Sequence, residues 1–307
     1  MDGRTITIGT RGSRLALAQA AEVASALRFS FPDVAFRIRT IRTAGDAMRR
    51  LPPPGEGERG LFVKEIEREL ERGRIDLAVH SLKDMPAALP PGMAVAAVTR
   101  RADPFDAIVS AGGEELLDLP GGGRVGTSSP RRAALILAVR PDLRIVPAKG
   151  NLDTRLRRLD EGVFDAVVVA AAGLARLGLT GVLTQRLTPP SFLPAPGQGC
   201  LAVEARSDDA AAARIAGAID HPPSRAAAAA ERALLAALGG GCRTPIAAYA
   251  EPAASRGTLR LAGCILSPDG RRAARGDAEG PAADPAALGR RLAEQLLRAG
   301  GAALRNG

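Results

Sequence analysis

The sequence predicts an α/β protein with two βα domains followed by a small α+β domain. Through the first two-thirds of the chain, short apolar strand patterns alternate with helical patterns, and polar turns containing glycine or serine join them. The last third begins with an alanine-rich helical segment and continues with strand patterns and a final helix. A length of 307 residues fits two or three domains of ordinary size.

The first domain is predicted to combine residues 1–99 with residues 200–217. Cys200–Ala205 reads as a strand beyond the Pro/Gly hinge Leu193–Gly199, and we expect it to return to the first sheet. The other strands of this domain are expected at residues 5–8, 35–42, 75–79 and 93–98, and its helices at residues 15–27 and 61–71.

The polar segment Arg100–Pro104 marks the crossing to a second domain, residues 105–193. The linker His221-Pro222-Pro223 opens a third domain, residues 222–307. In the second domain we expect strands at 106–110, 124–126, 144–147 and 164–169, and helices that open near 130 and 153 and at 170. In the third we expect helices at 224–238 and 285–304 and strands at 246–250, 258–265 and near 271–275.

The charge balance favours a small polyanionic ligand. The net charge is +9, but aromatic residues make up only 3% of the chain, whereas nucleic-acid binding by stacking needs them among the basic residues. The basic side chains are spread over several loops, which suits a ligand with many carboxylates. His80 and His221 are far apart and show no metal-ligand spacing, so we expect no metal.

The cysteines and the apolar runs indicate where the protein works. Three cysteines, Cys200, Cys242 and Cys264, are too few for a disulfide framework and favour a reducing compartment. The N-terminus leads directly into a strand pattern without a signal peptide, and no apolar run is long enough for a bilayer. We expect a soluble cytoplasmic protein that binds no membrane.

Two βα turns of the first domain carry candidate ligand-binding groups. Gly9–Arg14 is a polar glycine turn between a strand and a helix, so its backbone N–H groups, with Arg11 and Ser13, are available to an anion. It lacks the lysine of a P-loop, and an ordinary βα turn remains the alternative. The second turn follows the strand that ends at Val79 and reads His80-Ser81-Leu82-Lys83-Asp84-Met85-Pro86.

Asp84 is the best general-acid or general-base candidate in the chain. It follows a compact apolar strand, and ligands of open α/β sheets bind at that strand end. Lys83 is placed to keep the carboxylate ionised, although such a neighbouring pair is more often a solvated surface pair.

The second domain repeats this arrangement. Ser129 and Pro130 open a helix as N-cap and first-turn residue, and Arg131 and Arg132 lie in that first turn. Paired cations there oppose the helix dipole, so we expect an anion to bind beside them. Lys149-Gly150-Asn151 opens the next helix in the same way, and that helix carries Arg155.

Cys242 follows three glycines, Gly239–Gly241, that end the alanine-rich helix. One glycine suffices to stop a helix, and three make an accessible loop with a nucleophile at its tip. Pro245 prevents the helix from resuming. The alternative is a helix stop followed by a small buried cysteine.

Taken together, these motifs closely resemble those of the porphobilinogen deaminase (hydroxymethylbilane synthase) family, nearly from end to end. The strongest matches are Gly9–Ser13, Asp76–Pro86, Val125–Arg132, Gly150–Asp160, Pro194–Gly199 and Gly240–Cys242. The resemblance implies two domains like those of type II periplasmic binding proteins, flanking a cleft, and a third domain bearing the cofactor.

The resemblance also implies the chemistry. A dipyrromethane primer, joined by a thioether to Cys242, is extended by four porphobilinogens with loss of ammonia, and hydroxymethylbilane is released by hydrolysis. Asp84 matches the catalytic aspartate. Residues that match cofactor-binding positions are Lys83, Ser129, Arg131, Arg132, Gly150 and Arg155, and those that match substrate-binding positions are Arg11, Ser13, Ser81, Lys149, Arg176 and Gln198.

One position departs from the family pattern. The family usually has arginine at Lys149, and lysine keeps the charge but loses the forked geometry.

A non-catalytic two-lobed binding protein for an anionic ligand is the main alternative class, and a nucleic-acid binder is the third class. We expect a monomer that uses porphobilinogen and hands its product to the next enzyme of tetrapyrrole synthesis.

Overall fold

The computed structural model describes residues 5–43, 63–86, 88–240 and 245–305. These residues form two compact units, Met1–Arg101 with Cys200–Arg225, and Ala102–Gly199 with Ala226–Gly307. The expected return of Cys200–Ala205 to the first part of the chain is thereby confirmed. The expected second and third domains lie in the second unit, except that residues 222–225 belong to the first, so the boundary between these two domains stays a prediction.

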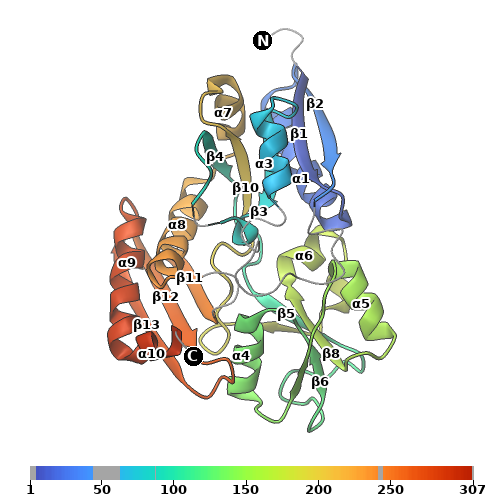
Figure 1. The fold of residues 1–307 in the computed structure, drawn as a ribbon, viewed down its shortest axis with the longest axis vertical. Coiled ribbons are helices and arrows are strands. Elements are labelled where there is room, and N and C mark those ends of the chain that lie inside the picture. Colours follow the sequence, from blue (N-terminus) through green and yellow to red (C-terminus); the bar gives the residue numbers. More distant parts are fainter. Residues whose placement is uncertain (1–4, 44–62, 87, 241–244, 306–307) are drawn as a thin grey trace. The chain divides into compact units, whose positions relative to one another are not determined.

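The first unit is built on one five-stranded sheet with the strand order β2-β1-β3-β10-β4 (Figure 1). Strands β2, β1 and β3 are parallel, and β10 pairs antiparallel with both β3 and β4. The strands are β1 (Thr5–Arg11), β2 (Ala35–Ile41), β3 (Leu77–Ser81), β4 (Met93–Val98) and β10 (Leu201–Arg206), and the helices are α1 (Arg14–Ser30), α3 (Lys64–Glu71), the short 3-10 helix η1 (Leu82–Asp84) and α7 (Ala210–Gly217).

Side chains of alternate β3 residues enter two different apolar clusters, as the period of a strand requires. Leu77 and Val79 pack in a large cluster with residues of α1, β1, β10 and α7. Ala78 packs in a smaller cluster with Ile66 and Leu70 of α3. The sheet is therefore covered by α1 and α7 on one face and by α3 on the other.

The second unit contains a sheet of the same plan, with the order β7-β6-β8-β5-β9. Three parallel strands, β7, β6 and β8, are again followed by an antiparallel strand, here β5, and an edge strand. The strands are β5 (Asp106–Ser110), β6 (Arg124–Gly126), β7 (Arg144–Val146), β8 (Ala166–Ala170) and β9 (Gln185–Leu187), and the helices are α4 (Pro130–Val139), α5 (Leu152–Asp160), α6 (Ala171–Arg176) and the short η2 (Thr180–Val182).

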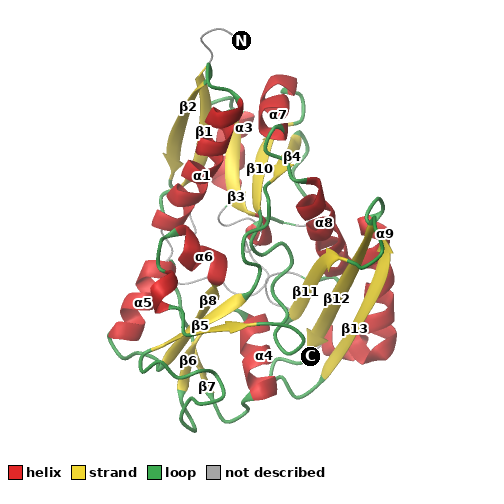
Figure 2. Ribbon diagram, turned by 180° about the vertical axis from the view of Figure 1, so that it is seen from behind, coloured by secondary structure: helices red, strands yellow, loops and turns green. Residues whose placement is uncertain are grey.

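The third sheet is an antiparallel meander, β11-β12-β13, beside which α8 and α9 lie (Figure 2). Its turn at Gly270 contacts α4 so closely that a Cβ there would lie 2.3 Å from the carbonyl oxygen of Ala134. Cys264 and Leu266 of β12 share a core cluster with α4. The elements are β11 (Ile246–Pro252), β12 (Thr258–Leu266), β13 (Ala273–Pro281), α8 (Pro222–Ala237), α9 (Pro285–Leu296) and α10 (Ala302–Arg305).

The structure corrects two details of the predicted elements. The continuous helix expected over residues 285–304 is wrong, because a π-helical segment, Leu297–Gly301, separates α9 from α10 and Gly300 has φ = +98°. Strand β9 and helix α7 were not expected: β9 has only three residues, and the alanines of α7 give little apolar contrast. Among the described residues, no helix is long and apolar enough to cross a membrane.

Candidate functional site

In the first unit, the predicted residues lie at the carboxyl ends of parallel strands. Arg11 is the last residue of β1 and Ser81 the last of β3. Because β1 and β3 run parallel, with Gly9 paired to Ala78, both side chains come to the same edge of the sheet. Ser13 follows as the N-cap of α1. The expected strand–turn–helix arrangement is confirmed here.

The segment that carries Asp84 is held by contacts from α1 and β10. The backbone N–H of Leu82 donates to the carbonyl oxygen of Cys200 at 3.1 Å, which extends the pairing of β3 with β10. The side-chain amide of Gln19, buried in α1, donates to Ser81 Oγ at 2.9 Å. Asp84 itself is exposed, and Lys83 is half-buried. The carboxylate is thus presented to solvent on a fixed backbone.

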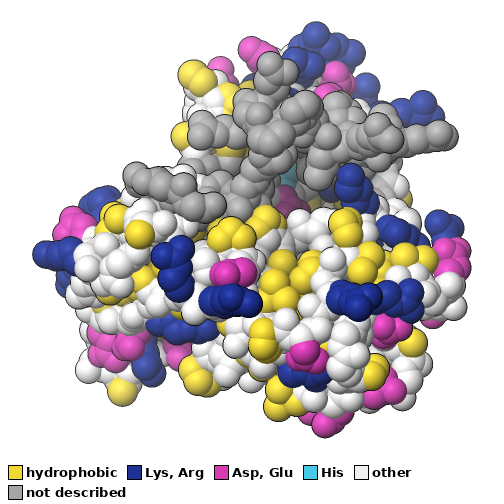
Figure 3. All heavy atoms as spheres, turned by 60° about the horizontal axis from the view of Figure 1, so that its bottom comes forward, with side chains coloured by type: hydrophobic (Ala, Val, Ile, Leu, Met, Phe, Trp, Pro, Cys, Tyr) yellow, Lys and Arg dark blue, Asp and Glu magenta, His cyan; other side chains and the backbone are white. Residues whose placement is uncertain are grey.

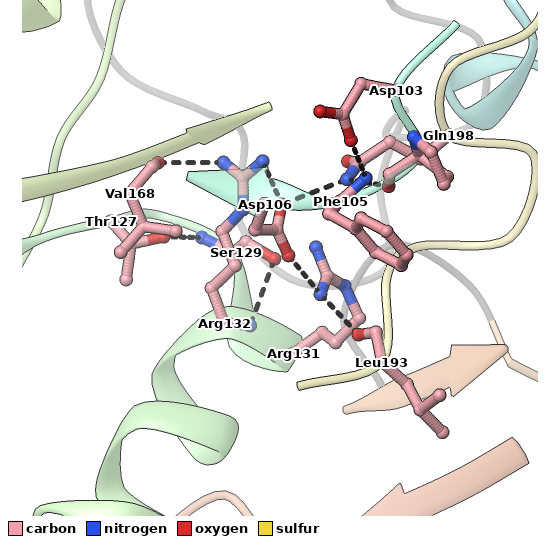
Figure 4. Close-up of polar contacts among 11 residues, drawn as sticks. Asp103, Phe105, Asp106, Thr127, Ser129, Arg131, Arg132, Val168, Leu193 and Gln198 are labelled. Carbon is pink, nitrogen blue, oxygen red and sulfur yellow. Dashed lines mark hydrogen bonds and ion pairs between the residues drawn. The ribbon is translucent and has the colours of Figure 1, made fainter. Parts of the chain in front are cut away.

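In the second unit, Arg131 and Arg132 share one internal carboxylate (Figure 4). Arg131 Nη1 donates to Asp106 Oδ2 at 2.6 Å and to the Leu193 carbonyl oxygen at 2.9 Å. Arg132 donates to Asp106 Oδ1 from Nε at 2.9 Å and from Nη2 at 2.7 Å, and to the Val168 carbonyl oxygen at 2.9 Å. Both arginines are 5% exposed and Asp106 is 0% exposed.

Asp106 reaches these arginines because of the direction of its strand. It is the first residue of β5, which runs antiparallel to β8, and it pairs with Ala170 at the carboxyl end of β8. Gln198 adds a third partner: its side-chain amide donates to Asp106 Oδ1 at 3.1 Å and to the Pro104 carbonyl oxygen at 2.8 Å. Gln198 is therefore brought together with the paired arginines.

The anion expected beside Arg131 and Arg132 is supplied, in part, by the chain itself. Two guanidinium groups and one carboxylate leave a net charge of +1 on this buried trio, so it remains complementary to a further anion. Asp106 was not among the residues predicted from the sequence. The available signal was an acidic residue at the start of an apolar strand, since a buried charge requires a partner. Gln19, a buried amide within a helix, was missed in the same way.

A pocket of about 300 Å³ lies beside the N-terminus of α4. Ser129 caps this helix, accepting from the backbone N–H of Arg132 at 3.4 Å, and Lys149 is exposed at the other side of the pocket. Ser129 and Lys149 both line this pocket. The residues that line it are Thr127, Ser128, Ser129, Pro130, Ala133, Pro147 and Lys149.

A glycine and local hydrogen bonds fix the turn from Lys149 to α5. Gly150 has φ = +98°, a conformation that favours glycine. Asn151 caps α5 through a bond from the Thr154 N–H at 2.9 Å, and Arg155 Nε donates to the Gly150 carbonyl oxygen at 2.9 Å. Arg176, in the last turn of α6, donates to the Gly199 carbonyl oxygen at 3.2 Å. Arg155 and Arg176 are both half-buried at the edge where β7 and β8 end.

Cys242 and the expected mobile loop at residues 49–60 lie outside the described residues. The other two cysteines are buried, as expected: Cys200 precedes β10 and Cys264 lies in β12. Burial raises the pKa of the Cys264 thiol to about 11, which makes it a poor nucleophile at neutral pH. Cys242 therefore remains the candidate for covalent attachment.

The donors of both units suit carboxylate groups better than a metal or a nucleic acid. The described residues hold no group of three or more His, Cys, Asp or Glu side chains arranged for a metal ion. On the face drawn in Figure 3, Lys and Arg side chains alternate with acidic and apolar ones and do not merge into a continuous basic strip. Arginine, lysine and hydroxyl side chains are donors that suit carboxylates.

Two sheets of the same strand order, each with polar or cationic turns at its parallel carboxyl edge, define an α/β protein of the type II periplasmic-binding-protein class with an added α+β part. Within that class the sequence comparisons are specific. Residues 6–214 match the family model "Porphobilinogen deaminase, dipyromethane cofactor binding domain", and residues 226–298 match "Porphobilinogen deaminase, C-terminal domain". The chain belongs to the porphobilinogen deaminase family.

Relatives of full length agree with this assignment. The chain is 50% identical over 300 residues to a porphobilinogen deaminase of Roseiflexus castenholzii, with 98% of each chain covered. It is 50% identical to one of Desulforudis audaxviator, covering 97% of this chain and 96% of that one, and 46% identical to one of Thermus thermophilus, covering 97% of each.

Solved structures give weaker matches. The methionine binding protein MetQ is 14% identical, with a TM-score of 0.46 over 70% of this chain and 89% of that one. A probable amino-acid transporter binding protein of Bacillus subtilis, ytmK, is 14% identical, with a TM-score of 0.41 over 70% and 90%.

Proposed function

We infer that this protein is a hydroxymethylbilane synthase, a transferase of tetrapyrrole biosynthesis. It condenses four porphobilinogen molecules head to tail, with release of ammonia, and hydrolysis frees hydroxymethylbilane. The observation that carries this conclusion is the match of both family models, which together span residues 6–298 apart from a short linker. The family resemblance found in the sequence motifs is confirmed by these matches.

The cofactor of this family is dipyrromethane, which, when bound, provides the primer to which substrate units are added. We propose that Cys242 holds it through a thioether. Support comes from the sequence, where three glycines before Cys242 predict an accessible loop, and from the burial of Cys200 and Cys264. The donor set of the second unit is consistent with the carboxylates of such a group.

We propose that cationic and hydroxyl side chains, with the backbone of Gly150 and the amide of Gln198, bind the acetate and propionate groups of the pyrroles. The net positive charge on Asp106, Arg131 and Arg132 attracts one such group, and the neighbouring pocket offers Ser129 and Lys149 to another. Each charged hydrogen bond contributes about 1.5–3 kcal/mol. The proposed set is Arg11, Ser13, Ser81, Lys83, Ser129, Arg131, Arg132, Lys149, Gly150, Arg155, Arg176 and Gln198.

Asp84 is the proposed catalytic residue. Positive charge develops on pyrrole nitrogens both when ammonia leaves and when the new carbon–carbon bond forms. An exposed carboxylate on a fixed backbone is suited to accept a hydrogen bond from a pyrrole N–H, to stabilise this charge and to take up a proton.

Intact mass and ammonia release test the proposal together. Active wild-type protein should exceed its sequence mass by one dipyrromethane, whereas Cys242→Ser should not, and Cys200→Ala and Cys264→Ala should keep the added mass and the turnover. An active enzyme of unmodified mass would refute the attachment. A protein that binds porphobilinogen without releasing ammonia would instead be a binding protein.

We further propose that the enzyme works as a monomer in the cytoplasm and passes its product to the next enzyme of the pathway. A reducing compartment is consistent with three cysteines, of which Cys200 and Cys264 are buried. Sedimentation of the holoenzyme at micromolar concentration tests the monomer, and a mass of two chains would contradict it.

A further inference from the structure

A buried histidine–carboxylate pair lies immediately before the segment that carries Asp84. His80 Nε2 and Glu204 Oε2 are 3.0 Å apart, and the residues are 6% and 0% exposed. With Glu204 ionised and the imidazole carrying its hydrogen on Nε2, the imidazole is the donor. His80 is in β3 and Glu204 in β10, two paired strands of the first sheet. The proposed chemistry uses neither residue.

We propose that His80, through its hydrogen bond to Glu204, is a positioning residue for Asp84. The inference rests on the catalytic role proposed for Asp84. His80 acts through the backbone: it precedes Ser81, and the 3-10 helix Leu82–Asp84 follows directly.

The geometry shows that this segment is held on both faces of the sheet. Because side chains alternate along β3, His80 lies on the α3 face and Ser81 on the α1 face. Gln19 of α1 binds the hydroxyl of Ser81 at 2.9 Å, and Glu204 binds the imidazole of His80 at 3.0 Å. These two bonds, with the backbone bond from Leu82 to β10, define where the 3-10 helix begins.

The charged groups around His80 and Glu204 argue against a purely stabilising role for this pair. Replacing a buried polar pair by apolar residues of similar volume is often neutral or stabilising, so such a pair is a weak stabilising device. Here it adds cost: Glu67 of α3 brings a second carboxylate, and one oxygen each of Glu67 and Glu204 lacks a hydrogen-bond partner among the described residues. Lys64, His80 and Glu204 are the groups that act electrostatically on Glu67. A costly arrangement beside a catalytic segment is consistent with a role in geometry.

The test compares kcat and KM of folded holoenzymes, checked by intact mass and by urea unfolding. His80→Leu removes the donor and should lower kcat about 10- to 100-fold, because small misplacements of a reacting group have effects of this size. KM for porphobilinogen should stay within about twofold. His80→Gln keeps a side-chain N–H near the position of Nε2 and should recover most of the lost kcat.

A matched control is Asp209→Asn, which weakens another ion pair of the same unit, Arg206 Nη2 to Asp209 Oδ2 at 2.6 Å, at the far end of β10. It should destabilise the unit and leave kcat unchanged. If His80→Leu keeps wild-type kcat, or if Asp209→Asn loses as much, the proposal is overturned. Should His80→Leu not fold, Glu204→Met, which is of similar length and removes the acceptor oxygen, replaces it, and an unchanged kcat in that variant overturns the proposal equally.

Asp84→Asn is measured alongside and separates the two hypotheses. If Asp84→Asn keeps its turnover, the catalytic role of Asp84 fails, whatever His80 does. If Asp84→Asn is inactive while His80→Leu is normal, only the positioning role fails.

Discussion

A single oxygen of Asp106 binds Arg132 twice. Oδ1 accepts from Nε at 2.9 Å and from Nη2 at 2.7 Å, which leaves Oδ2 to Arg131 Nη1 at 2.6 Å. One carboxylate therefore orients two guanidinium groups in the first turn of α4. Among the described residues, the hydrogen bonds of the Arg131 guanidinium to Asp106 and Leu193 both come from Nη1. We therefore expect a ligand carboxylate to bind on the Arg131 side of the trio.

Asp106→Asn should destabilise the second unit strongly. The amide keeps the shape but removes the negative charge that two buried guanidinium groups share. Breaking a buried ion pair in this way costs about 3–5 kcal/mol. Urea unfolding of the holoenzyme measures the loss, and intact mass shows whether the cofactor is still acquired.

Asp165→Asn is the control for this measurement. Asp165 also binds an arginine twice, with Arg124 Nη2 at 2.7 Å and Nε at 3.3 Å, but this pair lies at the surface. Because solvent screens exposed pairs, the loss should be much smaller than for Asp106. Equal losses in the two variants would show that Asp106 is not a special counter-ion.

The case of Asp106 also marks the limit of what the sequence could predict. Local patterns were enough to place the capping of α4 by Ser129 and Pro130 and the polar turn after β3, because capping and strand periodicity depend on neighbouring residues. The partner of Arg131 and Arg132 lies 25 and 26 residues upstream of them, in an antiparallel strand. Only strand order brings it to the helix, and strand order is not a local property.

The same distinction explains the other differences. The motif around Asp84 identified the candidate, but the supports from Gln19 and Glu204 come from a helix and a strand remote in sequence. The predicted C-terminal helix is too long, because its apolar spacing continues past Gly300, where the backbone departs from helical angles.

Asp84→Glu should retain the cofactor and lose most of its turnover. The longer side chain keeps the charge but moves the carboxylate by one methylene, so it no longer meets the pyrrole N–H. Positioned acid–base groups contribute about 10²- to 10⁴-fold, and we expect a loss within that range. Single-turnover kinetics with porphobilinogen, on protein whose added mass is confirmed, measure it.

Asp33→Glu makes the same change at an exposed aspartate in the turn between α1 and β2. It should keep wild-type turnover. A near-normal rate for Asp84→Glu would refute the assigned role, whatever the control shows.

Lys149→Met should weaken substrate use in a salt-dependent way. Lys149 is exposed beside the pocket at α4, so its attraction for a carboxylate is screened by ions. We expect kcat/KM to fall about 10-fold at low ionic strength, the size of one charged hydrogen bond, and less at high ionic strength. Lys149→Arg should keep or improve the wild-type value, because the forked group matches a carboxylate better.

Arg144→Met is the matched control. Arg144 is also exposed, but it begins β7, whereas Lys149 follows the carboxyl end of that strand. Its loss should change kcat/KM little at either ionic strength. A salt-independent effect of Lys149→Met would argue for a packing role instead of a charge role.

Glu67 gives the first unit a pH dependence of known sign. Burial raises the pKa of the Glu67 carboxyl, the charge of Glu204 raises it further, and His80 and Lys64 act in the opposite direction. Between the ordinary pKa and the raised one, the folded state therefore keeps a proton on Glu67 that the unfolded chain has already released. Stability falls with rising pH wherever the folded state binds more protons, which here begins near the ordinary value of 4.5 and ends above the raised pKa.

Glu67→Gln removes this dependence, because the amide resembles the protonated acid and does not titrate. Relative to wild type, the variant should gain free energy of unfolding as the pH rises from 4 through the raised pKa, and the gain should level off above it. Urea unfolding of both holoenzymes at a series of pH values measures the difference. A gain that appears instead as the pH falls would mean that Glu67 is ionised in the folded protein, and the carboxylate would then have to be stabilised by Lys64 or His80 against both its burial and the charge of Glu204.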